Sequence, residues 1–350
     1  MGGLSACSHR TPYFREGLPS FGADGAAQPL RSRVILVGDA GEVDAVVLEQ
    51  VEQWAGMDPS ATLVAFLGDN MYPEGMTRRR LHEAEARLLP QIQAAERSGA
   101  RVVFIPGNHD WAEGGEEGFE AVLEQERYVH ARLGYAGGFL PQNGCPGPAV
   151  ADLFDGVRIV ALDTQWWLHA GPKPTTECPE GTSEEVLAAL GRLLDTDRHV
   201  VVLAHHPLFG YGRHAGFSEW REHLLPPIIG SVIALSRKLP LRSQDHNSAR
   251  YKAMVAAFEG VFRDRPEREG LLVWASGHEH NLQVLEGESV DYVLISGSGA
   301  KTTPVNDGDE TLFAHSRPGF MALDVLTTGA AILRVIEPDG GAVFTLRLEE

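Results

Sequence analysis

Short runs of apolar, often β-branched residues recur along the chain from residue 33 onward, and each run ends at a glycine or a polar residue. In the first half these runs are Val34–Val37, Leu63–Leu67, Val102–Ile105, Val157–Leu162 and Val200–Leu203. Their apolar positions are continuous rather than alternating, which is typical of strands buried on both faces. Segments with helical spacing fall between them, at 42–56, 78–98, 117–133 and 183–195. This alternation predicts an α/β fold with a mixed or parallel sheet.

The second half repeats the pattern after an insertion at about 207–265. Strands are predicted at Leu271–Ala275, Tyr292–Ile295, Phe320–Val325, Ala331–Val335 and Val343–Leu348. Short turns join the last three, which favours antiparallel pairing. The insertion includes a predicted amphipathic helix around 251–262 and is long enough to form a lid or a rim. Residues 1–30 lack periodicity, so we expect a flexible tail followed by one domain over 31–350.

The charge balance of the chain restricts the kinds of molecule that it could bind. The chain has 350 residues, of which 43% are hydrophobic and 22% charged, as in ordinary globular proteins. Its 30 basic and 48 acidic residues give a net charge of −18, which disfavours long nucleic acids and anionic membrane surfaces. No apolar run approaches the roughly 18 residues of a membrane-spanning helix. Any anionic substrate would need a strong local positive centre, and a metal ion is a compact one.

The three cysteines leave alternatives open. Leu4-Ser5-Ala6-Cys7 is similar to the end of a bacterial lipoprotein signal, which predicts a lipid anchor at Cys7 and a location in the cell envelope or periplasm. The charged and apolar parts of such a signal do not precede it, so either the start is assigned too late or the match is chance. Cys145 and Cys178 could pair in an oxidising compartment or remain two unpaired loop cysteines.

Polar side chains gather just after the predicted strands. The segments are Gly38–Gly41, Gly68–Tyr72, Gly107–Asp110, Ala204–Pro207 and Gly277–His280. Taken singly, each is a helix cap or a turn. Because the carboxyl ends of strands in an α/β sheet converge on one rim, we expect the five segments to meet there. Carboxylate, amide, phenol and imidazole ligands together suit iron, manganese or zinc.

In order and spacing these motifs resemble the calcineurin-like metallophosphoesterase superfamily and, within it, the purple acid phosphatase branch. The series is Asp-x-Gly, Gly-Asp-x-x-Tyr, Gly-Asn-His-Asp, a histidine after a strand, and Gly-His-x-His, over residues 38–280. Gly41 stands where most of the superfamily has a metal-binding histidine, and Tyr72 supplies a ligand instead, as in the purple branch. The resemblance implies a four-layer sandwich of two mixed β-sheets flanked by helices.

The resemblance also implies a dinuclear metal centre. Its ligands would be Asp39, Asp69, Tyr72 and His280 for the first metal, and Asp69, Asn108, His205 and His278 for the second, with Asp69 bridging. Phenolate is a hard donor, so we expect Fe(III) at the Tyr72 site and a divalent Fe, Zn or Mn ion at the other. Two metals about 3.5–4 Å apart suit in-line phosphoryl displacement by a metal-bound hydroxide.

Histidines beside the ligands are candidates for catalytic roles. In the family a residue matching His109 contacts substrate, and Asp110 is expected to orient it. His214 lies nine residues after His205, where the branch places a substrate-contacting or proton-donating histidine. His206 would point away from the site in an extended segment, so a structural role is favoured for it.

The best hypothesis is therefore a phosphomonoester hydrolase. A phosphodiesterase acting on nucleotides or lipid head groups would use the same metal centre. Two alternatives belong to other functional classes: a non-catalytic metal-binding scaffold, and a protein for metal storage or redox chemistry. Arg213 and Lys301 are candidate phosphate contacts, although solvated surface charge is the simpler interpretation. The chain lacks a Gly-x-Ser-x-Gly motif, so covalent serine catalysis is not supported.

Overall fold

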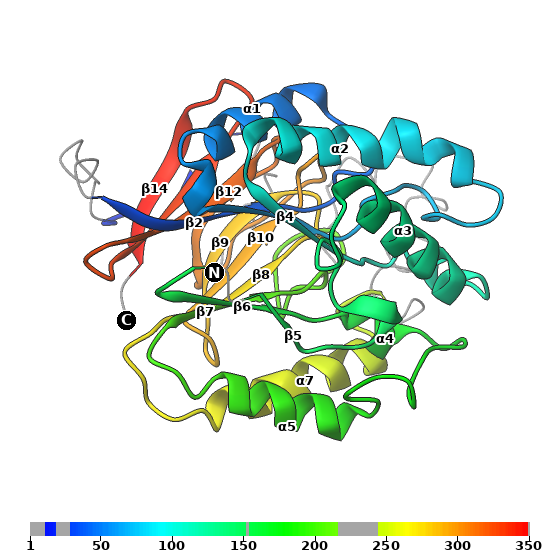
Figure 1. Ribbon diagram of the computed structural model, residues 1–350. Coiled ribbons are helices and arrows are strands. Elements are labelled where there is room, and N and C mark those ends of the chain that lie inside the picture. Colours follow the sequence, from blue (N-terminus) through cyan, green and yellow to red (C-terminus); the bar gives the residue numbers. More distant parts are fainter. Residues whose placement is uncertain (1–10, 19–28, 152–153, 216–243, 349–350) are drawn as a thin grey trace, which may run out of the picture.

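Two β-sheets lie face to face with helices on their outer sides (Figure 1). The computed structural model describes residues 11–18, 29–151, 154–215 and 244–348. Cys7 and residues 216–243 of the insertion lie outside these ranges, so the expectations for them stay predictions. None of the described helices is long and apolar enough to span a bilayer.

The first sheet has six strands and mixes parallel with antiparallel pairs. Its order is β14 (Ala342–Leu348), β13 (Ala331–Ile336), β12 (Phe320–Leu326), β2 (Leu30–Val37), β3 (Thr62–Leu67) and β4 (Arg101–Ile105). Strands β2, β3 and β4 are parallel, while β12 to β14 pair antiparallel, as their short connecting turns predicted.

The second sheet has eight strands and is also mixed. Its order is β1 (Tyr13–Phe14), β11 (Thr311–His315), β9 (Leu282–Glu286), β10 (Tyr292–Ser296), β8 (Leu272–Ser276), β7 (His199–Leu203), β6 (Val157–Ala161) and β5 (Ala149–Val150). The central strands β6, β7, β8 and β10 are parallel. The short strands β1, β5, β9 and β11 were not predicted from the sequence.

The described helices form the two outer layers, at the top and bottom of Figure 1. Helices α1 (Ala45–Gly56), α2 (Ala84–Ser98) and α3 (Gly118–Leu133) cover the six-stranded sheet, and α4 (Thr164–Leu168), α5 (Ser183–Leu193) and α7 (Ala249–Arg263) cover the eight-stranded one. All except α4 fall where helical spacing was noted. The architecture is the predicted four-layer sandwich.

Side-chain alternation along the strands explains the layers. On β2, Val34 and Leu36 point into the core between the two sheets, whereas Ile35 and Val37 pack under the helices. Both sets are fully buried, so the strand carries a continuous apolar run. In β2 the polar residues precede this run, at positions 31–33, and Asp39 follows in the loop after the strand.

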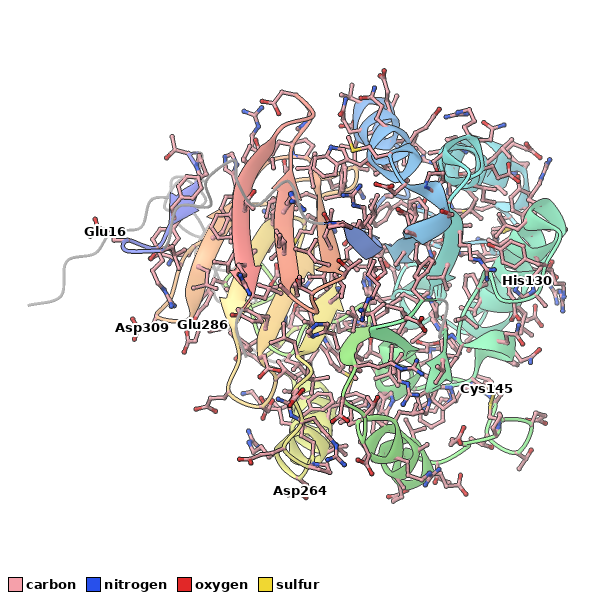
Figure 2. All side chains as sticks on the ribbon, turned by 60° about the vertical axis from the view of Figure 1, so that its left-hand side comes forward. Glu16, His130, Cys145, Asp264, Glu286 and Asp309 are labelled. Carbon is pink, nitrogen blue, oxygen red and sulfur yellow. A yellow bond between two sulfur atoms is a disulfide. The ribbon has the colours of Figure 1, made fainter. Side chains whose placement is uncertain are left out.

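Part of the N-terminal segment belongs to the eight-stranded sheet. Strand β1 pairs antiparallel with β11, and Phe14 contacts Phe313 edge to face at 5.5 Å between ring centroids. The Arg15 guanidinium lies 2.5 Å from a carboxylate oxygen of Glu286. Figure 2 labels Glu286 near Glu16 and Asp309, at one edge of the molecule. Residues 11–18 thus have a place in the fold, within the stretch that we expected to be a tail.

Cys145 and Cys178 form a disulfide, with Cα atoms 5.6 Å apart. Figure 2 labels Cys145 at the edge of the molecule below α3. Of the two alternatives left by the sequence, the paired one is therefore correct. The bridge closes a segment 33 residues long that contains β5, β6 and α4.

Candidate metal centre

The carboxyl ends of five strands bring the predicted ligands to one place. Asp39, Asp69 and Asn108 follow β2, β3 and β4 of one sheet, while His205 and His278 follow β7 and β8 of the other. All five are buried, with exposed fractions between 0% and 6%. Asp39, Asp69 and His205 each offer an atom within 4.8 Å of the others. The rim expected from the strand pattern therefore exists and draws on both sheets.

Backbone strain marks three of these positions. Asp39, Asp69 and His278 have positive φ angles of 58°, 54° and 70°, which are uncommon for residues with a side chain. Such conformations cost on the order of 1–3 kcal/mol each and cluster at functional sites. Each of the three follows a glycine, and a Cβ on Gly277 would lie 2.5 Å from Asp39 Oδ2. The sharp turns aim all three side chains into the rim.

The first ligand group gathers around the phenol oxygen of Tyr72. This hydroxyl donates to Asp39 Oδ1 at 2.9 Å and lies 3.2 Å from His280 Nε2. His280 Nε2 is also 3.4 Å from Asp39 Oδ1, so three potential ligand atoms converge. The other Asp39 oxygen accepts the His278 backbone N–H at 2.8 Å. Without a cation, burial and the Asp39 carboxylate raise the pKa of Tyr72 well above its usual value.

The second group is built around His205. Its Nδ1 atom lies 2.9 Å from the Leu67 carbonyl, to which only an N–H can donate, so in the neutral ring, the form that binds a metal, Nε2 is the lone-pair nitrogen. This lone pair faces Asn108 Oδ1 at 3.0 Å and Asp69 Oδ1 at 3.4 Å, and both of those atoms are also acceptors. Burial alone would raise the pKa of Asp69, but positive charge on the His205 and His109 rings lowers it to about 2, and a cation in place of the His205 Nε2 proton would supply the same kind of charge.

His278 repeats this arrangement. Its Nε2 atom lies 3.1 Å from the Gln244 carbonyl, which leaves Nδ1 facing Asn108 Oδ1 at 3.1 Å. Burial and the neighbouring imidazoles lower the pKa of His278 well below its usual value, so the ring is neutral. Acceptor atoms therefore point at one another across the rim. A cation between them would turn these contacts from repulsive to attractive, so the residues fit a metal centre.

Asp110 does not orient His109, contrary to expectation. The buried Asp110 carboxylate accepts hydrogen bonds from the backbone N–H groups of Asn70 at 3.1 Å, Met71 at 3.2 Å and Gly107 at 2.8 Å. It thereby fixes the loop after β3 to the loop after β4. Burial and the charge of Asp69 raise the pKa of Asp110 to about 7. The structure gives this carboxyl a positioning role for the two loops.

His109 is oriented by other groups. Its Nδ1 atom contacts the Pro73 carbonyl and lies 3.3 Å from Glu113 Oε1. Its Nε2 atom is 3.8 Å from Asp69 Oδ2, and its ring meets the Tyr72 ring edge to face at 4.6 Å. His109 is thus at the rim beside both ligand groups, where a substrate contact is expected.

His214 and His206 lie on the other side of the rim. The His214 ring is 4.1 Å from the His278 ring between centroids, and its Nδ1 atom is 3.3 Å from Asp245 Oδ1. His206 is held at both nitrogens, by Thr164 and by the Gln244 side chain, each at 2.8 Å. This supports the structural role predicted for His206, although its ring is close enough to His205 and His278 to be a ligand geometrically.

Sequence reasoning missed two residues of this region. Asp245, which pairs with His214, and Gln244, which contacts His278 and His206, both lie in the insertion. The polar run 244–247 was the only signal, because no motif fixes the path of the insertion back to the rim.

A buried set of carboxylate, phenol, amide and imidazole donors at the strand ends of a two-sheet sandwich is typical of a metal-dependent class of protein. The sequence model of the calcineurin-like phosphoesterase family matches residues 32–282, which includes every predicted ligand. The chain belongs to this family, and it is a metallophosphoesterase. A comparison with curated proteins found no match.

Solved structures show the same fold at low sequence identity. A purple acid phosphatase from yellow lupin (Lupinus luteus) seeds has 14% identity and a TM-score of 0.57, covering 90% of this chain and 53% of that one. A dimetal phosphatase from Danio rerio has 13% identity and a TM-score of 0.51, covering 91% and 100%. A protein described as the anchor in the inner membrane complex of Plasmodium has 15% identity and a TM-score of 0.54, covering 92% and 90%.

Proposed function

We propose that this protein is a phosphomonoester hydrolase with two metal ions, of the acid phosphatase kind. The observation that carries the proposal is the set of acceptor atoms that face one another across the rim, above all His205 Nε2 against Asn108 Oδ1 and Asp69 Oδ1. Asp39, Tyr72 and His280 would hold one metal, Asn108, His205 and His278 the other, and Asp69 both. When bound, the metals would supply Lewis acidity and a more acidic water.

The chain's own residues would do the remaining work. His109 would donate a hydrogen bond to a phosphoryl oxygen from beside Tyr72, and His214 would stand on the opposite side, held by Asp245. Asp110 would keep the β3 and β4 loops in register, which preserves the spacing of Asp69 and Asn108. The imidazoles of His109 and His214, on the two sides of the metal ligands, could then donate hydrogen bonds or a proton to the bound phosphate ester.

The chemistry of the donor atoms supports a proposal for the identity of the two metals. The Tyr72 oxygen, once deprotonated, is a hard anionic ligand that favours a trivalent ion, so we propose Fe(III) there and divalent Fe, Zn or Mn at the amide and imidazole site. The similarity in fold to a purple acid phosphatase is in keeping with this choice but does not carry it, because identity is only 14%.

Two alternatives remain for the same test. The first alternative is a phosphodiesterase, which would use the same metal ligands. The second is a scaffold that binds metal without catalysing hydrolysis; the Plasmodium protein of similar fold is described as an anchor. The presence of His109 and His214 at the rim favours catalysis, since metal binding alone needs neither.

The deciding experiment compares p-nitrophenyl phosphate with bis(p-nitrophenyl) phosphate, from acid to neutral pH, on protein whose metal content and visible spectrum are recorded. Turnover of the monoester by violet, iron-containing protein is expected. Preference for the diester would move the assignment to a phosphodiesterase. No turnover of either ester by folded, fully metallated protein would contradict the proposal.

We also propose an oxidising compartment, the cell envelope or periplasm, with a lipid anchor at Cys7. The Cys145–Cys178 disulfide supports the compartment, because such bonds persist mainly outside the reducing cytosol. Detection of the protein in the membrane-associated fraction of the envelope, and its loss from that fraction in a Cys7→Ala variant, is the expected result.

A further inference from the structure

A single lysine stands beside the Tyr72 ligand. Lys301 Nζ lies 3.4 Å from the centroid of the Tyr72 ring and 2.9 Å from Glu42 Oε1. Its side chain is 28% exposed, so the ammonium is at the surface of the rim rather than sealed beneath it. His109 meets the edge of the same phenol ring. The two groups that could offer a proton or a positive charge to a substrate therefore flank Tyr72.

The backbone on both sides of Lys301 is tied to the loops that carry metal ligands. The N–H of Gly299 donates to the Gly38 carbonyl at 2.9 Å, and the N–H of Thr303 donates to the His280 carbonyl at 2.6 Å. A Cβ at Gly299 would meet Gly38 O and Ala40, so the turn packs directly on the Asp39 loop. The fold thus fixes the position of Lys301 relative to Asp39 and His280.

Charge gives this position its importance. The protein carries a net charge of −18 and has only four lysines, Lys173, Lys238, Lys252 and Lys301. A phosphate dianion approaching the rim meets the overall negative field, which a fixed local cation offsets at short range. The Glu42 carboxylate holds Lys301 loosely, because ion pairs between partly exposed side chains are weak.

We propose that Lys301 is a substrate-binding residue whose ammonium contacts a phosphoryl oxygen, and that Glu42 competes with the substrate for it. This inference rests on the proposed function. Binding of the phosphate exchanges one anionic partner of the ammonium, the Glu42 carboxylate, for another. Removing the lysine therefore weakens phosphate binding, whereas removing the charge of Glu42 strengthens it.

The test measures p-nitrophenyl phosphate hydrolysis and its inhibition by inorganic phosphate in the metal-loaded full chain. Lys301→Met is expected to raise KM and the phosphate inhibition constant about tenfold with little change in kcat, the signature of lost ground-state binding. Glu42→Gln is expected to lower both constants about two- to fivefold. Lys301→Arg should restore part of the affinity. Lys252→Met, an exposed lysine on α7, is the matched control and should resemble the wild type.

If Lys301 and Glu42 formed only a structural ion pair, both variants would change KM and the phosphate inhibition constant in the same direction. Shifts in opposite directions therefore support the proposal. If Lys301→Met and Glu42→Gln move the constants in the same direction, or if Lys301→Met matches Lys252→Met, the proposal is wrong. Metal content is measured in each variant, and a change in kcat that follows metal loss would likewise count against a binding role. If the wild type hydrolyses no phosphoester, the proposed function fails, and calorimetric titration of metal-loaded protein with inorganic phosphate still tests Lys301.

Discussion

Tyr72 and Asp39 lie 33 residues apart in the chain, yet the phenol hydroxyl donates to the Asp39 carboxylate across 2.9 Å in a site closed to solvent. Burial and Asp39 both oppose loss of the phenol proton, so the pair is costly to ionise unless a cation is present. A bound metal reverses this balance, because it attracts both oxygens.

Tyr72→Phe tests this relationship. The variant keeps the ring but loses the oxygen, so the first site should bind its metal at least about tenfold more weakly, and any visible phenolate-to-iron absorption should disappear. Metal content and the visible spectrum are measured together. A spectrum unchanged from the wild type would show that Tyr72 is not the ligand responsible for the colour.

Asp69→Asn tests the bridging role. Losing a neighbour of a ligand typically costs about 10–100-fold in metal affinity or activity, and losing a shared ligand should cost at least as much. We expect both metals to be depleted and hydrolysis to fall by ~100-fold or more. Asp155→Asn, an exposed carboxylate remote from the ligands, is the control. Full activity in Asp69→Asn would refute the assignment.

The disulfide is expected to stabilise the fold. Closing a segment of 33 residues lowers the entropy of the unfolded chain and so raises its free energy by about 3–4 kcal/mol at 25 °C in the loop-closure model. The Cys145→Ser/Cys178→Ser double variant should lose roughly this free energy of unfolding in a urea titration. Reductant should lower the stability of the wild type to the same level and leave the double variant unchanged. Equal stability of the two oxidised proteins would contradict the prediction.

Asp163 predicts a pH dependence of stability that is separate from the metal centre. Its carboxylate accepts from Trp111 Nε1 at 2.8 Å and from the Trp166 backbone at 3.0 Å, but burial raises its pKa to about 7 from an ordinary 3.8. Between pH 3.8 and about 7, the Asp163 carboxyl is therefore protonated in the folded state and ionised in the unfolded state. Stability from this group is fully present below about pH 4 and is lost as pH rises through 7.

Asp163→Asn removes this proton uptake. The slope of unfolding free energy against pH should become less negative by up to about 1.4 kcal/mol per pH unit between pH 4.5 and 6.5. Urea unfolding followed by tryptophan fluorescence measures it, because Trp111 and Trp166 contact the group directly. Parallel pH profiles for variant and wild type would show that the carboxyl titrates normally.

Most of the fold was predictable because local pattern and buried environment agree. Continuous apolar runs such as Leu63–Leu67 fit only strands covered on both faces, and β3 is one. The edge strands β1 and β5 were missed because two-residue segments have no period of their own. The buried strands β9 and β11 were missed because Gln283 and the flanking Thr311 and His315 leave apolar runs of only two or three residues. β1 is stabilised by Phe14 against Phe313 and by Arg15 against Glu286, contacts some 300 residues away in sequence.

The site divides in the same way. The sequence by itself determined which side chains stand at the strand ends. A buried apolar run marks the strand, the glycine after it marks the turn, and the next polar residue, such as Asp39 or Asp69, must then lie at the rim of the sheet. The tertiary structure decided which groups those side chains meet: Asp110 with the loop N–H groups, His214 with Asp245, and Lys301 with Tyr72. Contacts of that kind join loops whose paths depend on how two sheets and an insertion pack, and hydrophobic pattern carries no information about them.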